Sequence, residues 1–186
     1  MKTLITTLNS KYIHKSLSLR LLYVATKEYH EVDFKEYTIK EDLDTIANDI
    51  IEQKVQVVAF SVYIWNVDLI KILIDKLKKM DPQLVIVIGG PEVSYEIDYF
   101  LDNFKIAYLI SEVAFKELLD CLETQQPINI QGISRKDKRY YQQTKPVDLQ
   151  YLETLESPYL LKRDLADMDK RILYFETSRG CPYQCQ

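Results

Sequence analysis

Apolar runs and helix-like patterns alternate along the first two thirds of the chain. Five runs have the length and the apolar content of strands: residues 3–8, 32–38, 55–63, 84–90 and 106–110. Each is followed by a stretch in which apolar residues recur every three or four positions, as on one face of a helix. This alternation predicts an α/β fold with a doubly wound, five-stranded parallel sheet that fills residues 1–124. We expect the strand order 2-1-3-4-5, by analogy with other sheets of this kind.

The pattern changes after residue 124. Prolines and a local group of basic residues occur in the next stretch, which predicts a strap and linker over residues 125–170. The basic group is interpreted as a solvated turn rather than a patch for nucleic acid. Residues 171–178 then have the pattern of one more strand. We expect residues 171–186 to be the start of a second, truncated domain.

Composition indicates a folded protein and excludes some partners. The chain is 47% hydrophobic, which is enough to bury a core. Its formal net charge of -4 argues against nucleic acid as the main partner, because phosphate binding needs clustered Lys and Arg. The first residues do not form a signal peptide, and no apolar run approaches the ~18 residues of a membrane helix. We therefore expect a cytoplasmic protein without a membrane partner.

The loops after the strands are the first place to look for a ligand, because open parallel sheets bind ligands beyond the carboxyl ends of their strands. The loop after the fourth strand reads GGPEVSYE. Gly89 and Gly90 permit close approach to the backbone, and Pro91 stiffens the entry into the next helix. A tight strand-to-helix turn explains the same residues equally well. The dinucleotide-binding glycine motif and the P-loop motif are both absent from the sequence.

Two other loops carry polar and aromatic residues that are candidates for ligand binding. Ser61, Tyr63 and Trp65 follow the third strand, and Trp65 either faces a flat ligand or covers the helix beneath it. Asn66 is expected to cap that helix. His14, in the loop after the first strand, is either a metal ligand or proton carrier, or a surface or capping residue, as most lone loop histidines are.

The chain ends in TSRGCPYQCQ, which holds two of its three cysteines. An odd number of cysteines placed in this way does not form a disulfide framework. Cys181 and Cys185 form a CxxxC pair, which is the start of a CxxxCxxC loop. Three thiolates at that spacing hold three irons of a 4Fe–4S cluster. The alternatives are a pair of free thiols and half of a zinc site.

Four segments together resemble the cobalamin-binding-domain radical S-adenosylmethionine (SAM) proteins. LNSKYIHKSLSLRLL, GGPEVSYE, VDLQYLETLESPY and ILYFETSRGCPYQC occur in that family's order. The last is similar to the first barrel strand and the cluster loop of a radical SAM domain. The chain therefore resembles the N-terminal part of such a protein, in a subgroup often labelled magnesium-protoporphyrin IX monomethyl ester anaerobic oxidative cyclase.

The resemblance implies that residues 1–124 bind cobalamin, with the corrin ring over the carboxyl ends of the strands and the nucleotide tail beside the loops. The matching cofactor positions are Asn9, Ser10, Tyr12, Ser61, Tyr63, Trp65, Gly89, Gly90, Pro91 and Glu92. It also implies that Cys181 and Cys185 are cluster ligands. The full-length protein would use the 4Fe–4S cluster and SAM for methyl transfer or radical cyclisation, with its missing barrel as partner of the sheet. The fragment alone would be inactive.

Two features differ from the family pattern. Domains that supply a histidine to cobalt have a DxHxxG loop, but Tyr12 and Leu17 stand at its Asp and Gly positions around His14. No histidine ligand to cobalt is therefore expected. The loop after the fifth strand, around Ser111–Val113, lacks the glycines that admit the nucleotide tail in relatives. A second hypothesis is therefore a cobalamin-free docking or substrate-binding module of the same architecture.

Overall fold

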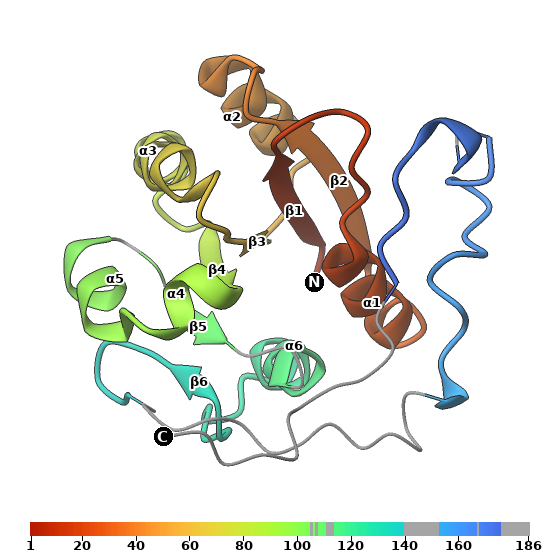
Figure 1. The fold of residues 1–186 in the computed structure, drawn as a ribbon. Helices are drawn as coiled ribbons and strands as arrows, with labels where there is room; N and C mark the ends of the chain where they lie inside the picture. The colour runs from red at the N-terminus through yellow and green to blue at the C-terminus, as the bar shows by residue number, and fades with distance from the viewer. Residues whose placement is uncertain (105, 107, 111–113, 140–152, 167, 176–186) are drawn as a thin grey trace, which may run out of the picture.

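A six-stranded sheet forms the centre of the computed structural model (Figure 1), which describes residues 1–104, 106, 108–110, 114–139, 153–166 and 168–175. Its strands are β1 (Thr3–Asn9), β2 (Val32–Thr38), β3 (Val57–Ser61), β4 (Val85–Gly89), β5 (Tyr108–Ile110) and β6 (Ile133–Ser134). Their order across the sheet is β2-β1-β3-β4-β5-β6. The first five strands pair in parallel, which confirms the expected order, and β6 adds a short antiparallel edge that the sequence did not predict.

Helices cover both faces of the sheet (Figure 1). They are α1 (Leu17–Thr26), α2 (Leu43–Glu52), α3 (Val67–Met80), α4 (Pro91–Ser94), α5 (Ile97–Asn103) and α6 (Phe115–Thr124). One core layer lies under α2, α3, α4 and α5, with Ile50, Leu73 and Phe100 buried in it. The other lies under α1 and α6, around Leu19 and Phe115. The predicted doubly wound arrangement is therefore confirmed. Within the described residues, no helix is both long and apolar enough to span a membrane.

Side-chain caps begin the first two helices. Ser16 and Asp42 precede α1 and α2 in extended conformations, and their side chains accept from the backbone N–H groups of Leu19 and Thr45. Each cap satisfies one of the N–H groups that a helix N-terminus leaves without an intrahelical partner.

Asn66 precedes α3, as expected, but its side chain does not cap the helix. Its Oδ1 instead accepts from the Tyr63 backbone N–H at 2.8 Å. Its amide nitrogen donates to Thr7 Oγ1 and to the Leu8 carbonyl, both at 3.1 Å. The residue thus joins the loop after β3 to the neighbouring strand β1.

The fourth strand–helix unit also differs from the expectation. The sequence predicts one helical stretch after the fourth strand, but the structure contains the two short helices α4 and α5. Glu96 separates them with φ -118° and ψ 42°, outside the helical region. The apolar residues of both helices still face the same core layer, so the hydrophobic pattern identified the buried face but not the break.

Residues 153–166 lie on the α1 side of the sheet (Figure 1). Leu161 is buried there in the same core layer as Leu19. Residues 171–178 were expected to form a strand, but their described part, 171–175, contains only one bridge, from Ile172 to His14. The Ile172 N–H donates to the Ile13 carbonyl at 2.7 Å. Pairing is limited because the neighbour is a loop rather than a strand. Residues 176–178 lie outside the described part of the chain.

Candidate functional site

A pocket opens at the carboxyl ends of the central strands, between the sheet, α1 and α6. It is lined by Ile5, Ser18, Leu22, Ala59, Phe60, Ser61, Tyr63, Val87, Gly89, Gly90, Pro91 and Phe115. Its cavity volume is about 60 Å³. At roughly 10–15 Å³ for each water, that is room for a group the size of one small ring. Five of the ten predicted cofactor positions line this pocket.

The pocket has apolar walls and a polar rim. Ile5, Ala59 and Val87 come from three neighbouring parallel strands, and Leu22 and Phe115 come from the helices above them. Such walls favour the flat face of an apolar ring, because burial of apolar surface is favourable and leaves no polar atom unpaired.

Four hydroxyl groups form a hydrogen-bonded set, which we call the hydroxyl row: Ser18, Ser61 and Tyr63 at the rim of the pocket, and Ser16 outside its lining. Ser18 Oγ lies 3.0 Å from Ser16 Oγ, 3.1 Å from Ser61 Oγ and 3.0 Å from Tyr63 Oη. Hydroxyl groups can each donate and accept. The row can therefore adjust its hydrogen bonds to a polar atom placed at the mouth of the pocket.

The aromatic residues after β3 extend this rim outward. Trp65 stacks on Tyr63 with a ring separation of 4.5 Å and an interplanar angle of 5°. Trp65 remains 47% exposed, and Ile64 beside it is 76% exposed. The Trp65 ring thus packs on Tyr63, and part of it remains exposed to solvent.

The two glycines of the loop after β4 have different roles. Gly90 has φ +114°, and a Cβ at this position would lie 2.4 Å from the Val62 carbonyl oxygen. The close crossing of two backbone segments therefore requires glycine whether or not a ligand is present. Gly89 lines the pocket, together with Pro91. Glu92 lies in α4 and does not line it.

The predicted residues after β1 do not line the pocket. Asn9 is buried and donates to the His14 carbonyl at 2.9 Å and to Glu36 Oε1 at 3.0 Å, so it holds the loop in shape. Tyr12 is 64% exposed and lies under the guanidinium group of Arg171. Ser10 is half-buried in the same loop.

His14 contacts the C-terminal part of the described chain. Its Nδ1 lies 2.6 Å from the hydroxyl group of Tyr174, and the two rings are tilted at 32°. This contact fits the predicted surface role. No group of three His, Cys, Asp or Glu side chains within the described residues is placed to hold a metal ion. Cys181, Cys185 and the loop Ser111–Val113 lie outside those residues.

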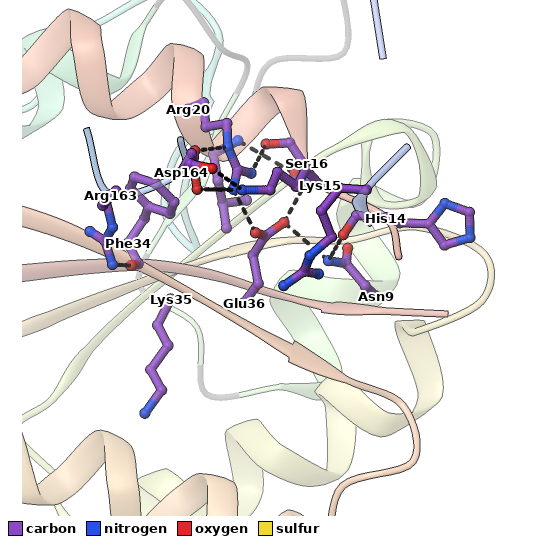
Figure 2. Close-up of polar contacts among 12 residues, drawn as sticks. Asn9, His14, Lys15, Ser16, Arg20, Phe34, Lys35, Glu36, Arg163 and Asp164 are labelled. Atoms are coloured by element: carbon purple, nitrogen blue, oxygen red, sulfur yellow. Dashed lines mark hydrogen bonds and ion pairs between the residues drawn. The ribbon is translucent and has the colours of Figure 1, made fainter. Parts of the chain in front are cut away.

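An ion cluster lies directly behind the loop after β1 (Figure 2): Lys15, Arg20, Glu36 and Asp164. Asp164 accepts from Lys15 Nζ at 2.8 Å and from Arg20 Nε at 2.6 Å. Arg20 also donates to Glu36 at 2.8 Å. Lys15, Arg20 and Asp164 are all buried. Among the described residues, two cations and two carboxylates thus meet in a site that water scarcely reaches.

Two groups of this cluster, Asp164 and Arg20, are held in their ionised forms. Burial opposes ionisation of Asp164, but hydrogen bonds from Arg20 and Lys15 outweigh it and lower the pKa of its carboxyl group. Burial likewise opposes the charge on Arg20, and its bonds to Asp164 and Glu36 raise the pKa of the guanidinium group. Asp164 and Arg20 are therefore both ionised at neutral pH.

Comparison with known proteins identifies the family. A model of the B12 binding domain matches residues 3–119. The chain belongs to the B12-binding domain family. It is 32% identical over 154 residues to the cobalamin-dependent radical SAM methyltransferase TokK of Streptomyces tokunonensis. It is 31% identical over 144 residues to 2-(S-pantetheinyl)-carbapenam-3-carboxylate methyltransferase of Streptantibioticus cattleyicolor. These matches cover 75% and 69% of this chain but only 22% and 21% of the relatives.

Solved structures show the same fold. The cobalamin-dependent SAM radical enzyme OxsB, with aqua-cobalamin and SAM bound, superposes with a TM-score of 0.75 at 18% identity. That match covers 98% of this chain and 27% of OxsB. The apo, selenomethionine-labelled OxsB gives a TM-score of 0.69 at 17% identity. The predicted fold and the predicted B12-binding domain are thus confirmed, and the oxidative-cyclase subgroup stays a prediction. This chain spans about a quarter of the solved chain.

The sequence did not reveal every residue at the site. Ser18 joins the hydroxyl row, but a serine at a helix start is also a common capping signal, and Ser16 beside it does cap α1. Phe115 and Leu22 fall in the helical stretches that the sequence predicts, and nothing in those patterns marks them as pocket residues. Asp164 lies outside the part of the chain that the B12-binding domain model matches. A motif search restricted to the loops after the strands could not have found it.

Proposed function

We propose that this B12-binding domain binds cobalamin, with the apolar pocket between α1 and α6 receiving the base of its nucleotide tail. The pocket at the carboxyl ends of β1, β3 and β4 is the observation that carries the proposal. Its walls suit a flat aromatic base, and the hydroxyl row supplies hydrogen bonds where a polar ring atom or ribose oxygen would lie. When bound, the cofactor supplies a cobalt centre able to carry a methyl group.

The residues of this chain would bind and orient that cofactor. Ser18, Ser61 and Tyr63 would contact polar atoms at the pocket mouth, while Gly89 and Pro91 would contact the tail where it enters. Trp65 and Tyr12 are exposed beside the same loops and would contact the corrin ring. Asn9 would shape the loop through its hydrogen bonds to His14 and Glu36, and its contact with the cofactor stays a prediction.

We further propose that the full-length protein is a radical SAM methyltransferase. Both curated relatives named above are methyltransferases, so methyl transfer is favoured over cyclisation. Cys181 and Cys185 would be the first two thiolate ligands of its 4Fe–4S cluster. The barrel that binds SAM would be the partner of the exposed carboxyl-end loops.

Filling the pocket tests the cobalamin proposal. Ser18→Leu places a larger apolar side chain at the mouth and is compatible with α1, because leucine is a good helix former. We expect anaerobic titration with hydroxocobalamin to give saturable binding to the wild-type chain and at least roughly tenfold weaker binding to Ser18→Leu.

Ser94→Leu is the matched control, since it makes the same change at an exposed position in α4 outside the pocket. It should bind like the wild type. Equal binding by all three chains would show that the pocket is not the site. No uptake by the wild type would favour the cobalamin-free docking module.

A further inference from the structure

The inner end of the pocket between α1 and α6 is apolar, and the register of the strands shows why. Ile5 pairs with Ala59, and Ala59 pairs with Val87, so these three residues form one row across β1, β3 and β4. All three belong to the core layer under α1 and α6 and line the pocket. We call this row the apolar floor. Alanine is the smallest of its three side chains and stands in the middle, which leaves room at the centre of the row.

The next row toward the carboxyl ends of the strands is different. Ser61 pairs with Gly89, and each lies two residues beyond its counterpart in the apolar floor. At about 3.3 Å per residue, the two rows are roughly 7 Å apart along the strands. Ser61 Oγ belongs to the hydroxyl row, whereas the side chains of the apolar floor contain only carbon and hydrogen. The sheet therefore presents a polar mouth and an apolar inner end.

The helix α1, which lies on the same side of the sheet as α6 (Figure 1), changes in the same direction. Ser18 lies in its first turn, and Leu22 lines the pocket four residues later, about 6 Å further along the helix. Because β1 and β2 are parallel, α1 runs back from the carboxyl ends of the strands. Leu22 is therefore further inside the pocket than Ser18. Phe115, buried at the start of α6, adds a further apolar side chain.

Polar partners for a ligand are concentrated at the mouth. Among the described residues that line the pocket, three members of the hydroxyl row supply the only polar side chains. The Ser61 carbonyl already accepts from Thr7 Oγ1 at 2.8 Å. The Gly89 carbonyl accepts from the Val62 N–H at 2.7 Å. A polar atom of a ligand is thus paired most readily beside the hydroxyl row.

The bases that can end a cobamide tail differ in where they carry polar atoms. In dimethylbenzimidazole and in adenine alike, the ribose is attached to the five-membered ring, so the six-membered ring is the part furthest from the ribose. The six-membered ring of dimethylbenzimidazole consists of carbon and carries two methyl groups. That of adenine contains two nitrogen atoms and carries an amino group. The two bases therefore have similar shapes but opposite polarity at the end that enters a pocket first.

We infer that the pocket selects a cobamide with a benzimidazole base over one with adenine, and that the apolar floor makes the selection. The inference rests on the proposed function. The six-membered ring would lie against the apolar floor, and the free nitrogen of the five-membered ring would lie beside the hydroxyl row. Adenine would place its amino group and ring nitrogens against alkyl side chains. Burial of a polar group without a partner is unfavourable, whereas burial of methyl groups is favourable.

Two cobamides and two variants of the 186-residue chain test the inference. Hydroxocobalamin and the corresponding adeninyl cobamide are titrated anaerobically, and the ratio of their dissociation constants is taken for each chain. Val87→Thr replaces a methyl group of the apolar floor by a hydroxyl group. Val57→Thr is the matched control, because Val57 is fully buried in the same core layer and does not line the pocket. Both variants share the cost of a buried hydroxyl group.

We expect the wild-type chain to bind the adeninyl cobamide at least roughly tenfold more weakly than hydroxocobalamin, the scale of one buried polar group without a partner. Val87→Thr should reduce this ratio at least roughly threefold, because its hydroxyl group can pair with a nitrogen atom of adenine. Val57→Thr should keep the wild-type ratio. Any difference between the two free cobamides cancels when the ratios of two chains are compared.

Equal affinity of the wild type for the two cobamides would overturn the inference and leave the proposed function standing. A ratio unchanged by Val87→Thr, or lowered equally by Val57→Thr, would also overturn it. If near-ultraviolet circular dichroism shows that Val87→Thr does not fold, Ala59→Ser places a hydroxyl group in the same row and takes its place. No uptake of either cobamide would show that the proposed function fails, and the inference with it.

Discussion

Gly90 holds the turn after β4 in a conformation that other residues rarely adopt. Its φ is +114°, and any Cβ would meet the Val62 carbonyl oxygen. We expect Gly90→Ala to lower the free energy of unfolding by about 1–3 kcal/mol, because backbone strain is added to the contact. Urea denaturation measures the change. Ser94→Ala, at an exposed position four residues later, should have a much smaller effect, and equal losses would contradict the role of Gly90.

Asp164 makes stability depend on pH. Its folded pKa is below the ordinary value, since hydrogen bonds from Arg20 and Lys15 outweigh the effect of burial. The stabilisation is therefore complete above the unfolded pKa of about 3.9 and is lost as the pH falls through the lower folded value. We expect the stability difference between the wild type and Asp164→Asn to narrow between about pH 5 and pH 2. A difference that stays constant over this range would show that Asp164 is not the titrating group.

The sequence identified the loops that surround the pocket better than it identified which of their side chains face it. Gly89, Ser61 and Tyr63 were predicted as cofactor positions, and all three line the pocket. Asn9 was predicted with them, but its amide group is used to hold the loop after β1. A motif match cannot separate a residue that shapes a loop from one that faces a ligand. That distinction depends on the direction of the side chain.

Among the elements, the segment over residues 153–166, which we call the extension, packs into the core of the sheet domain through Leu161. Leu161 is 5% exposed and packs with the residues beneath α1 and α6, whereas Leu160 is 63% exposed. We expect Leu161→Ala to destabilise the whole domain by about 2–5 kcal/mol, in a single transition followed by Trp65 fluorescence. Leu160→Ala should have little effect. A separate early transition in Leu161→Ala would show that the extension unfolds independently of the sheet.

The elements themselves were largely predictable, for a physical reason. Parallel strands buried on both faces give continuous apolar runs, as in β3 and β4, and such runs are distinct from helical stripes. The two-residue strand β6 is too short to leave a pattern. The break between α4 and α5 was missed because both helices present apolar residues to one core layer.

At the scale of the whole molecule, several exposed apolar side chains lie in loops at the carboxyl ends of the strands. Tyr12, Ile64 and Trp65 lie in loops after β1 and β3, and each is more than 45% exposed. The chain spans about a fifth of its curated relatives. We propose that the cofactor and the remaining domain of the full-length protein cover this surface.

The most direct measurement compares two corrinoids on the wild-type chain. Hydroxocobalamin carries a nucleotide base, and cobinamide has the same corrin ring without it. We expect saturable uptake of one equivalent of hydroxocobalamin under anaerobic conditions. Cobinamide should bind at least roughly tenfold more weakly, because burying an aromatic ring against apolar walls contributes more than about 1.4 kcal/mol. Equal affinity for the two corrinoids, or no uptake of either, would contradict a pocket built for the base of cobalamin.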